Sequence, residues 1–319
     1  MKSLRNKVVL SAVVLAFALI ATIGSTYAWF TVSDQASVTG VELNVQSSKS
    51  LLMRVYDGET GLLADDATEK LLDASTYSSN VSFSDITGTS TYSALDTYHI
   101  TPVTAAYDSN ADDTYDALNA KDLNLLNIDT KVLSAASGNA TDGNYIDIKF
   151  WLLSQTSTET VALDTLDITA SNVLGTKDAV TNAVNVAVWE SGHSTVAAGA
   201  ITGFVDTEST STAFIFSLNP DYAFAFESGM RGYNTGTPVL NSLSTAGDLV
   251  ALHSLYASTS SLANVSADTL MGATSVVTLT AGQPTLVTVR IYVEGWDAQT
   301  TNAILAAAFQ VSFKFTLRA

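Results

Sequence analysis

The residues best suited to bind a metal ion lie in the most acidic stretch of the chain, residues 108–129. Four oxygen-bearing side chains occupy positions 1, 3, 5 and 9 of a calcium-loop pattern there: Asp108, Asn110, Asp112 and Asp116. The stretch departs from the pattern because Asp113 replaces the glycine at position 6 and Asn119 replaces the glutamate at position 12. The sequence therefore favours a solvated acidic loop, and calcium is the only cofactor for which it offers a candidate site.

The other reactive side chains are not grouped for catalysis. His99, His193 and His253 are isolated and form no HExxH motif or other paired spacing, so a zinc hydrolase would lack its ligands. Residues 192–196 lack the second glycine of a nucleophile elbow. The chain has no cysteine and no glycine-rich phosphate loop. We therefore expect a protein that is not an enzyme.

A predicted turn with two acidic residues, a glycine and a tryptophan follows a strongly apolar segment. Its sequence is Glu294-Gly295-Trp296-Asp297. Glu294 or Asp297 would offer a carboxylate to a cation or to a partner. The commoner use of such a turn is structural: Gly295 makes the bend, Trp296 covers the edge of the core and Asp297 caps the next helix. The structural interpretation is favoured.

These side chains must be carried mainly by strands, because apolar and polar residues alternate along much of the chain. We expect strands at 41–46 and 51–56 to be neighbours, and 213–218 and 222–226 to form a hairpin. Further strands are predicted at 145–153, 161–170, 183–190, 275–280, 286–294 and 309–317. Helices are predicted only at 62–74, 112–126, 248–256 and 300–308. This pattern predicts an all-β fold with short helices, an antiparallel two-sheet sandwich of the jelly-roll or Ig-like kind.

The charge balance restricts the partners. The chain of 319 residues has 14 basic and 31 acidic residues, which gives a net charge of −17. Such a charge repels nucleic acid and anionic membrane surfaces, so neither is an expected partner. An exported chain without cysteine has no disulfides. Its stability must come from a large core, from a metal or from assembly.

Residues 1–28 have the three-part layout of a secretory signal peptide. Lys2, Arg5 and Lys7 precede an uncharged apolar run over 8–24, and Thr26-Tyr27-Ala28 forms a cleavage site before Trp29. Cleavage there removes three basic residues and no acidic one, which changes the net charge from −17 to −20. The expected location is secreted, extracellular or on the cell surface, with membrane contact only through the signal peptide. The alternative is that the segment is retained as an N-terminal anchor.

Cleavage would expose an apolar arm, residues 29–40, ahead of a single β-sandwich domain at 41–319 with an acidic, partly helical insertion near 60–140. The arm carries Trp29, Phe30, Val32 and Val38. A terminus meant only for solvent rarely begins with Trp-Phe, and an extended segment of this kind can complete the sheet of another copy. The alternative is that Trp29 and Phe30 pack into their own domain.

Three parts of the chain resemble the TasA/camelysin type of exported fibre proteins of Gram-positive bacteria. They are the junction STYAWFTVSDQASVTGVELNV, the strands NYIDIKFWLL and VNVAVWE, and the closing segment VRIYVEGWDAQTTNAILAAAFQVSFKF. The resemblance implies a jelly-roll subunit of an extracellular, biofilm-matrix or surface fibre. It also implies donor-strand exchange, with Trp29 to Val38 as the donor. The metallopeptidase activity associated with camelysin is not carried over, because the zinc ligands are missing.

The expected function is therefore a structural subunit of an extracellular filament or biofilm-matrix fibre. Its main partner is another copy of the chain, and other matrix proteins are further candidates. A monomeric cell-surface adhesin or ligand-binding module is the alternative, and a secreted metallopeptidase is the least favoured class.

Overall fold

The computed structural model describes residues 45–47, 51–58, 70–93, 95, 100–107, 117–118, 120–127, 132–138, 143–155, 157–171, 180–181, 183–218, 233–234, 237–238, 262–264, 275–295 and 308–318. The signal segment 1–28 and the arm 29–40 lie outside these residues. So do the strand predicted at 222–226, the helix predicted at 248–256 and residues 300–307 of the helix predicted at 300–308, whose last residue, Ala308, instead begins a strand.

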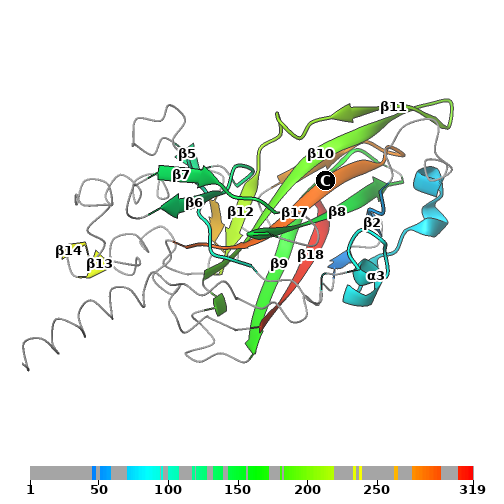
Figure 1. Ribbon diagram of the computed structural model, residues 1–319. Coiled ribbons are helices and arrows are strands. Elements are labelled where there is room, and N and C mark those ends of the chain that lie inside the picture. Colours follow the sequence, from blue (N-terminus) through cyan, green and yellow to red (C-terminus); the bar gives the residue numbers. More distant parts are fainter. Residues whose placement is uncertain are drawn as a thin grey trace, which may run out of the picture.

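Two packed β-sheets form the body of the protein, which is a β-sandwich (Figure 1). The five-stranded sheet has the order β16 (Ser275–Leu279), β9 (Glu159–Ser171), β18 (Ala308–Arg318), β1 (Val45–Ser47) and β3 (Asn80–Val81). The seven-stranded sheet runs β15 (Leu262–Asn264), β12 (Phe214–Ser217), β10 (Val184–Ala197), β17 (Thr285–Val293), β8 (Tyr145–Ser154) and β2 (Leu51–Val55), with β11 (Ala200–Asp206) also on β10. All pairings in both sheets are antiparallel except β1–β18 and β12–β15.

The strands with the clearest alternation are found where the sequence predicts them. In β18, Phe309, Val311, Phe313 and Phe315 are buried while the residues between them are partly exposed. All nine residues of β17 are buried. That strand lies between β10 and β8 and carries side chains into cores on both faces of its sheet. Alternation therefore marks strands with one covered face, and continuous burial marks the centre of the larger sheet.

Consecutive strands of the sandwich often lie in different sheets. The expectation that 41–46 and 51–56 pair with each other is wrong, because β1 pairs with β18 and β3 whereas β2 pairs with β8. Likewise, the chain crosses from β16 in the smaller sheet to β17 in the larger one through a turn with Gly282 at a φ of 71°. Alternation shows which face of a strand is buried but not which strand lies beside it.

The main core fills the space between the sheets. Phe150 of β8 meets Phe313 of β18 edge to face at 6.2 Å, and Phe313 meets Phe315 at 5.2 Å. Two smaller cores cover the outer face of the larger sheet. One joins Trp189 and Tyr292 to the segment around Val103 and Leu123, and the other joins Trp151 to Leu71 and Ile201. The chain between β3 and β8 thus covers part of a face that a bare sandwich would leave to solvent.

The helix predicted at 112–126 is wrong within the described residues. Residues at its centre form β5 (Ala117–Leu118), which pairs with β4 (Ala106–Tyr107), and those at its end form β6 (Asn124–Asn127), which pairs with β7 (Val132–Ala135). Leu123 and Asn124 are both buried because this segment packs on the outer face of the larger sheet, so tertiary contacts decide its conformation. One further two-stranded sheet joins β13 (Tyr233–Asn234) to β14 (Thr237–Pro238).

Short helices lie between β2 and β8 along the chain. Residues 70–72 are helical, and the 3-10 helix η1 (Ala74–Thr76) follows. The helix α3 (Phe83–Thr87) was not predicted, although Ser82 and Asp85 form a capping box at its start. It is only five residues long, so its hydrophobic signal is a single buried residue, Ile86. Among the described residues, no helix is long and apolar enough to span a membrane.

Candidate assembly site at the free edge of β9

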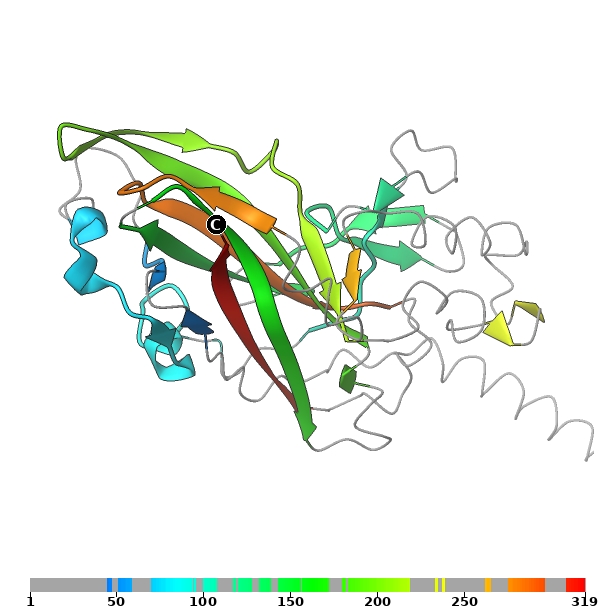
Figure 2. The ribbon, with the colours of Figure 1, turned by 180° about the vertical axis from the view of Figure 1, so that it is seen from behind.

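The longest strand of the smaller sheet is paired on only part of one side. β9 has 13 residues and is paired with β18 along 160–171. On its other side it is paired with β16 only over 159–162. Residues 163–171 therefore have no neighbouring strand on the side away from β18, within the part of the chain that the structure describes. In Figures 1 and 2 the lower ends of β9 and β18 extend together beyond the larger sheet.

One side-chain contact reaches the backbone of this edge. The hydroxyl of Thr181 donates a hydrogen bond to the carbonyl oxygen of Ile168 at 3.2 Å. Outside the ladder with β18, it is the only hydrogen bond that the structure gives to the backbone of residues 163–171 in the described chain. An open row of N–H and C=O groups is the surface to which an added strand binds.

The free edge borders the main core. Leu163, Leu166, Ile168 and Ala170 face inward and are at most 7% exposed. The outward residues Thr165, Asp167 and Thr169 are exposed. A strand added beside β9 would continue this division, with alternate side chains directed to the core and to solvent.

The larger sheet offers apolar side chains on the same side. In both ribbon views β12 lies on the side of β9 away from β18 (Figures 1 and 2). Phe216 of β12 is fully buried in the main core, while Phe214 and Leu218 are only partly buried against it. The apolar surface at this end of the sandwich is therefore incompletely covered by the described residues.

The predicted site residues lie outside the described part of the chain. This holds for the arm residues Trp29, Phe30, Val32 and Val38, and for the calcium candidates Asp108, Asn110, Asp112 and Asp116. The structure places the flanks of the acidic loop side by side, because Tyr107 pairs with Ala117. In the described residues, no group of three or more His, Asp or Glu side chains is arranged to hold a metal ion.

Glu294 is covered rather than open to a ligand. It is 1% exposed and its carboxylate accepts a hydrogen bond from the backbone N–H of Ala105 at 3.3 Å. The N–H of Gly295 donates to the carbonyl of Val103 at 2.7 Å, which ties this turn to the segment over the outer face. Trp296 and Asp297 lie outside the described residues. The contacts of Glu294 and Gly295 agree with the structural interpretation of the turn.

His193 has an acidic neighbour but no catalytic set. Its Nδ1 lies 2.7 Å from Glu190 Oε1, on the irregular stretch of β10 where the register with β17 shifts. Ser191 forms a hydrogen bond with Thr288, and Ser194 pairs with Phe204 in the ladder between β10 and β11. His193 and Glu190 thus contact each other, and Ser191 has a different partner.

The most extensive polar contact lies at Arg290, which no sequence motif marks. Its Nε and Nη2 each donate to one carboxylate oxygen of Asp147 at 2.7 Å, and its Nη1 donates to the carbonyls of Ala120 and Lys121. The guanidinium lies 3.7 Å from the ring centroid of Tyr145. A buried arginine with four hydrogen bonds thus fixes the segment at 120–121 to the outer face of β17.

Burial alone would lower the pKa of Arg290, but the hydrogen bonds and charge of Asp147 outweigh burial and raise that pKa above its ordinary value. Burial lowers the pKa of Lys121, although Glu208 and Asp122 oppose the effect. The ammonium of Lys121 donates to the carbonyls of Glu208 and Ser211, and Trp189 Nε1 donates to Glu208 at 2.7 Å. This cluster joins three segments of the chain. Its donors end on carbonyls and carboxylates of the protein itself.

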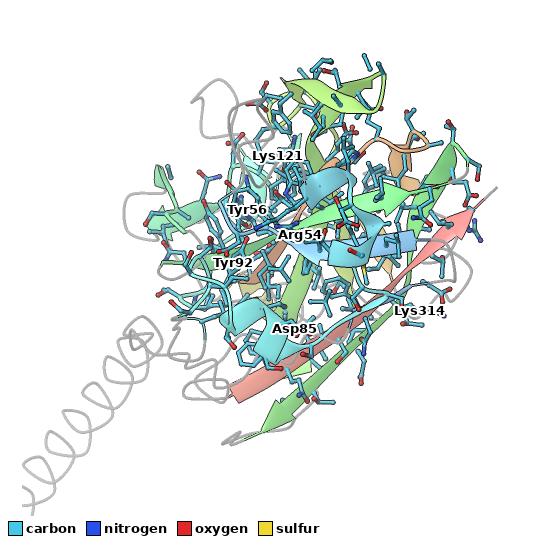
Figure 3. The ribbon with its side chains drawn as sticks, turned by 90° about the vertical axis from the view of Figure 1, so that its right-hand side faces the viewer. Arg54, Tyr56, Asp85, Tyr92, Lys121 and Lys314 are labelled. Atoms are coloured by element: carbon cyan, nitrogen blue, oxygen red, sulfur yellow. The ribbon has the colours of Figure 1, made fainter. Side chains whose placement is uncertain are left out.

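The side view separates this cluster from the free edge. Lys121 lies near the top of Figure 3, and Lys314 lies on β18 well away from it. Lys314 Nζ is 3.2 Å from Asp164 of β9, and both side chains are about one-third exposed. The ion pair therefore lies on the solvent face of the β9–β18 ribbon and leaves the edge of β9 unobstructed.

No protein-family model, no curated protein and no solved structure matches this chain.

Proposed function

We propose that this protein is an exported structural subunit of an extracellular filament or matrix fibre. In this proposal the arm of one copy, residues 29–38, adds as a strand to the free edge of β9 in the next copy. The observation that carries it is the run of residues 163–171, which borders the core and has no neighbouring strand in the described chain.

The arm has the length and pattern that the edge requires. It spans ten residues, against nine along the free part of β9. Apolar residues occupy alternate positions, with Phe30, Val32, Ala36 and Val38 interrupted only by Asp34. The positions between them are Thr31, Ser33, Gln35 and Ser37. A strand with one apolar and one polar face matches the inward and outward faces of β9.

Two kinds of interaction contribute favourable free energy when the arm pairs with β9. Each backbone hydrogen bond contributes about 0.5–1.5 kcal/mol net. Each fully buried Val or Phe side chain contributes about 1.5–3 kcal/mol. Because donor and acceptor are different surfaces of one chain, the contact is head-to-tail and its repetition gives an open filament. The negative charge of the chain opposes association, so added salt should favour it.

Electron microscopy of the mature chain, residues 29–319, tests the proposal. The expected result is filaments at neutral pH, with more of them at higher salt, and soluble monomers when 29–38 are deleted. Replacing Phe30, Val32 and Val38 by serine should also prevent assembly. The matched control replaces Thr31, Ser33 and Ser37 by alanine, which leaves the apolar face intact and should still assemble.

Two results would contradict the proposal. Filaments formed by the arm-deleted chain would show that assembly uses another surface. A mature chain that stays monomeric at all salt concentrations, with its arm protected from proteases, would show that the arm packs on its own domain. Specific binding of such a monomer to a surface glycan or protein would instead favour the adhesin.

A further inference from the structure

A second strand of the sandwich has a free edge. β11 is paired only with β10, through residues 200–206, and lies at the opposite end of the molecule from the lower tip of β9 in Figures 1 and 2. In the described chain, the backbone of these seven residues makes no hydrogen bond on the side away from β10. The free edges of β9 and β11 therefore lie on different surfaces.

This edge has only part of the usual protection against pairing. Exposed edges are commonly blocked by proline, by lysine, by inward-pointing charges or by β-bulges, and of these β11 has only a one-residue bulge at Thr202. The sequence of β11 is AITGFVD, whose only charge is Asp206 at its last position. Val205, at 40% exposure, is the exposed large hydrophobic residue of the described chain. Phe204 is held on the opposite face by Trp151, with ring centroids 6.1 Å apart, so the strand is fixed in place as an edge.

We infer that the free edge of β11 pairs antiparallel with the β11 of a second copy and thereby joins filaments side by side. The inference rests on the proposed function for its strength, since one seven-residue pairing is weak but is repeated in every subunit of a filament. A two-fold axis at Gly203 places Val205 opposite Ile201 and Asp206 opposite Ala200. No two acidic residues then stand directly opposite each other, so the strand is complementary to itself.

The test compares variants at position 205 by electron microscopy at about physiological salt, where charges are screened over roughly 8 Å. The wild-type chain should form laterally bundled filaments. Val205→Glu places a negative charge on both paired strands, and it should give single filaments of unchanged length. Val205→Thr is the matched control, because threonine keeps the β-branch without the charge, and it should still bundle.

Cross-linking identifies the contact directly. Because the chain has no cysteine, Gly203→Cys with a short bismaleimide can link only position 203 to position 203. The expected product is a covalent dimer from bundled filaments, whereas Thr278→Cys on the exposed face of β16 should give none. Bundles that survive Val205→Glu, or that give no dimer at position 203, would overturn the inference.

The remaining outcomes separate the two proposals. Wild-type filaments that never bundle would overturn the β11 pairing and leave the filament proposal standing. A chain that forms no filaments but cross-links through position 203 in concentrated solution would retain the β11 pairing and overturn the filament proposal. A chain that shows neither filaments nor dimers would overturn both.

Discussion

The hydroxyl of Thr181 donates a hydrogen bond to the carbonyl of Ile168 at 3.2 Å, across the free edge of β9. Thr181 precedes β10, so a residue leading into the larger sheet contacts the edge strand of the smaller one. An incoming strand would compete with this contact for the same carbonyl. Among the described residues, no strand blocks this edge, but it carries one contact that assembly must displace.

Thr181→Val should speed assembly. Removing the hydroxyl leaves the carbonyl of Ile168 available, and one net hydrogen bond of about 1 kcal/mol corresponds to a roughly five-fold change in rate. Light scattering of the mature chain should show a shorter lag. The matched control is Thr169→Val, whose hydroxyl contacts Gln310 on the outward face at 3.2 Å, and its lag should not change. Equal lags for both variants would show that Thr181 does not limit access to the edge.

Asp147→Asn should destabilise the arm-deleted monomer by about 3 kcal/mol, because it leaves the charge of a buried arginine without its carboxylate. Urea unfolding measures the loss. Asp164→Asn serves as the control, since it breaks the exposed pair with Lys314 and should cost less than about 1 kcal/mol. Similar losses of unfolding free energy for the two variants would mean that Arg290 does not fix the segment at 120–121 to the outer face of the sheet.

The capping box of α3 should stabilise the protein, and this contribution should be lost in acid. Hydrogen bonds from the side chain and the backbone of Ser82 lower the pKa of Asp85 below its ordinary value of 3.8. The contribution is therefore fully present above about pH 3.8 and is lost as the pH falls through the pKa of the folded state. Ser82→Ala should cost about 1 kcal/mol at neutral pH. The difference between wild type and variant should shrink below pH 3.8, as measured by urea unfolding across this range. A difference that does not change with pH would mean that Asp85 is not coupled to the cap.

Gly192→Ala should displace β11. A Cβ at this position would lie 2.3 Å from Cζ of Phe204 and 2.6 Å from the carbonyl oxygen of Val205. Since one of these atoms is backbone, β11 itself must shift, at a cost of about 1–3 kcal/mol. Gly203→Ala is the control, because its nearest neighbour is the side-chain oxygen of Thr195 at 3.1 Å. In thermal unfolding, Gly192→Ala should have a lower midpoint temperature than Gly203→Ala. Equal midpoints would show that β11 accommodates the methyl group at position 192.

The sequence was sufficient to predict strands such as β18 and β8, because one-sided burial leaves a period of two in β18 and in the first half of β8. It did not predict β3, β11 or β15, which are also part of the sandwich. It was not sufficient for pairing, which depends on contacts between distant segments such as Val45 with Phe313. The helix predicted at 112–126 fails for the same reason, since burial on a distant sheet face determines the structure of Leu123 and Asn124.

The candidate site, like the fold, could be predicted only in part from the sequence. The donor arm can be proposed from sequence, because apolar residues directly after a predicted signal peptide are a local feature. The acceptor edge cannot, because the sequence of β9 is that of any half-buried strand. Only the pairing shows that 163–171 have no neighbouring strand on one side in the described part of the chain. Arg290 was missed because its role depends on Asp147 and on carbonyls at 120–121, all far from it in the sequence.

Hydrogen exchange on β9 tests the central claim most directly. Backbone amides of 163–171 should be compared between filaments of the mature chain and the arm-deleted monomer. If the arm of a neighbouring copy pairs with this edge, the amides that point away from β18 exchange slowly in filaments and rapidly in the monomer. The amides of β17, which is paired on both sides, serve as the reference and stay slow in both. Equal exchange of 163–171 in the two states, in samples that contain filaments, would contradict the account.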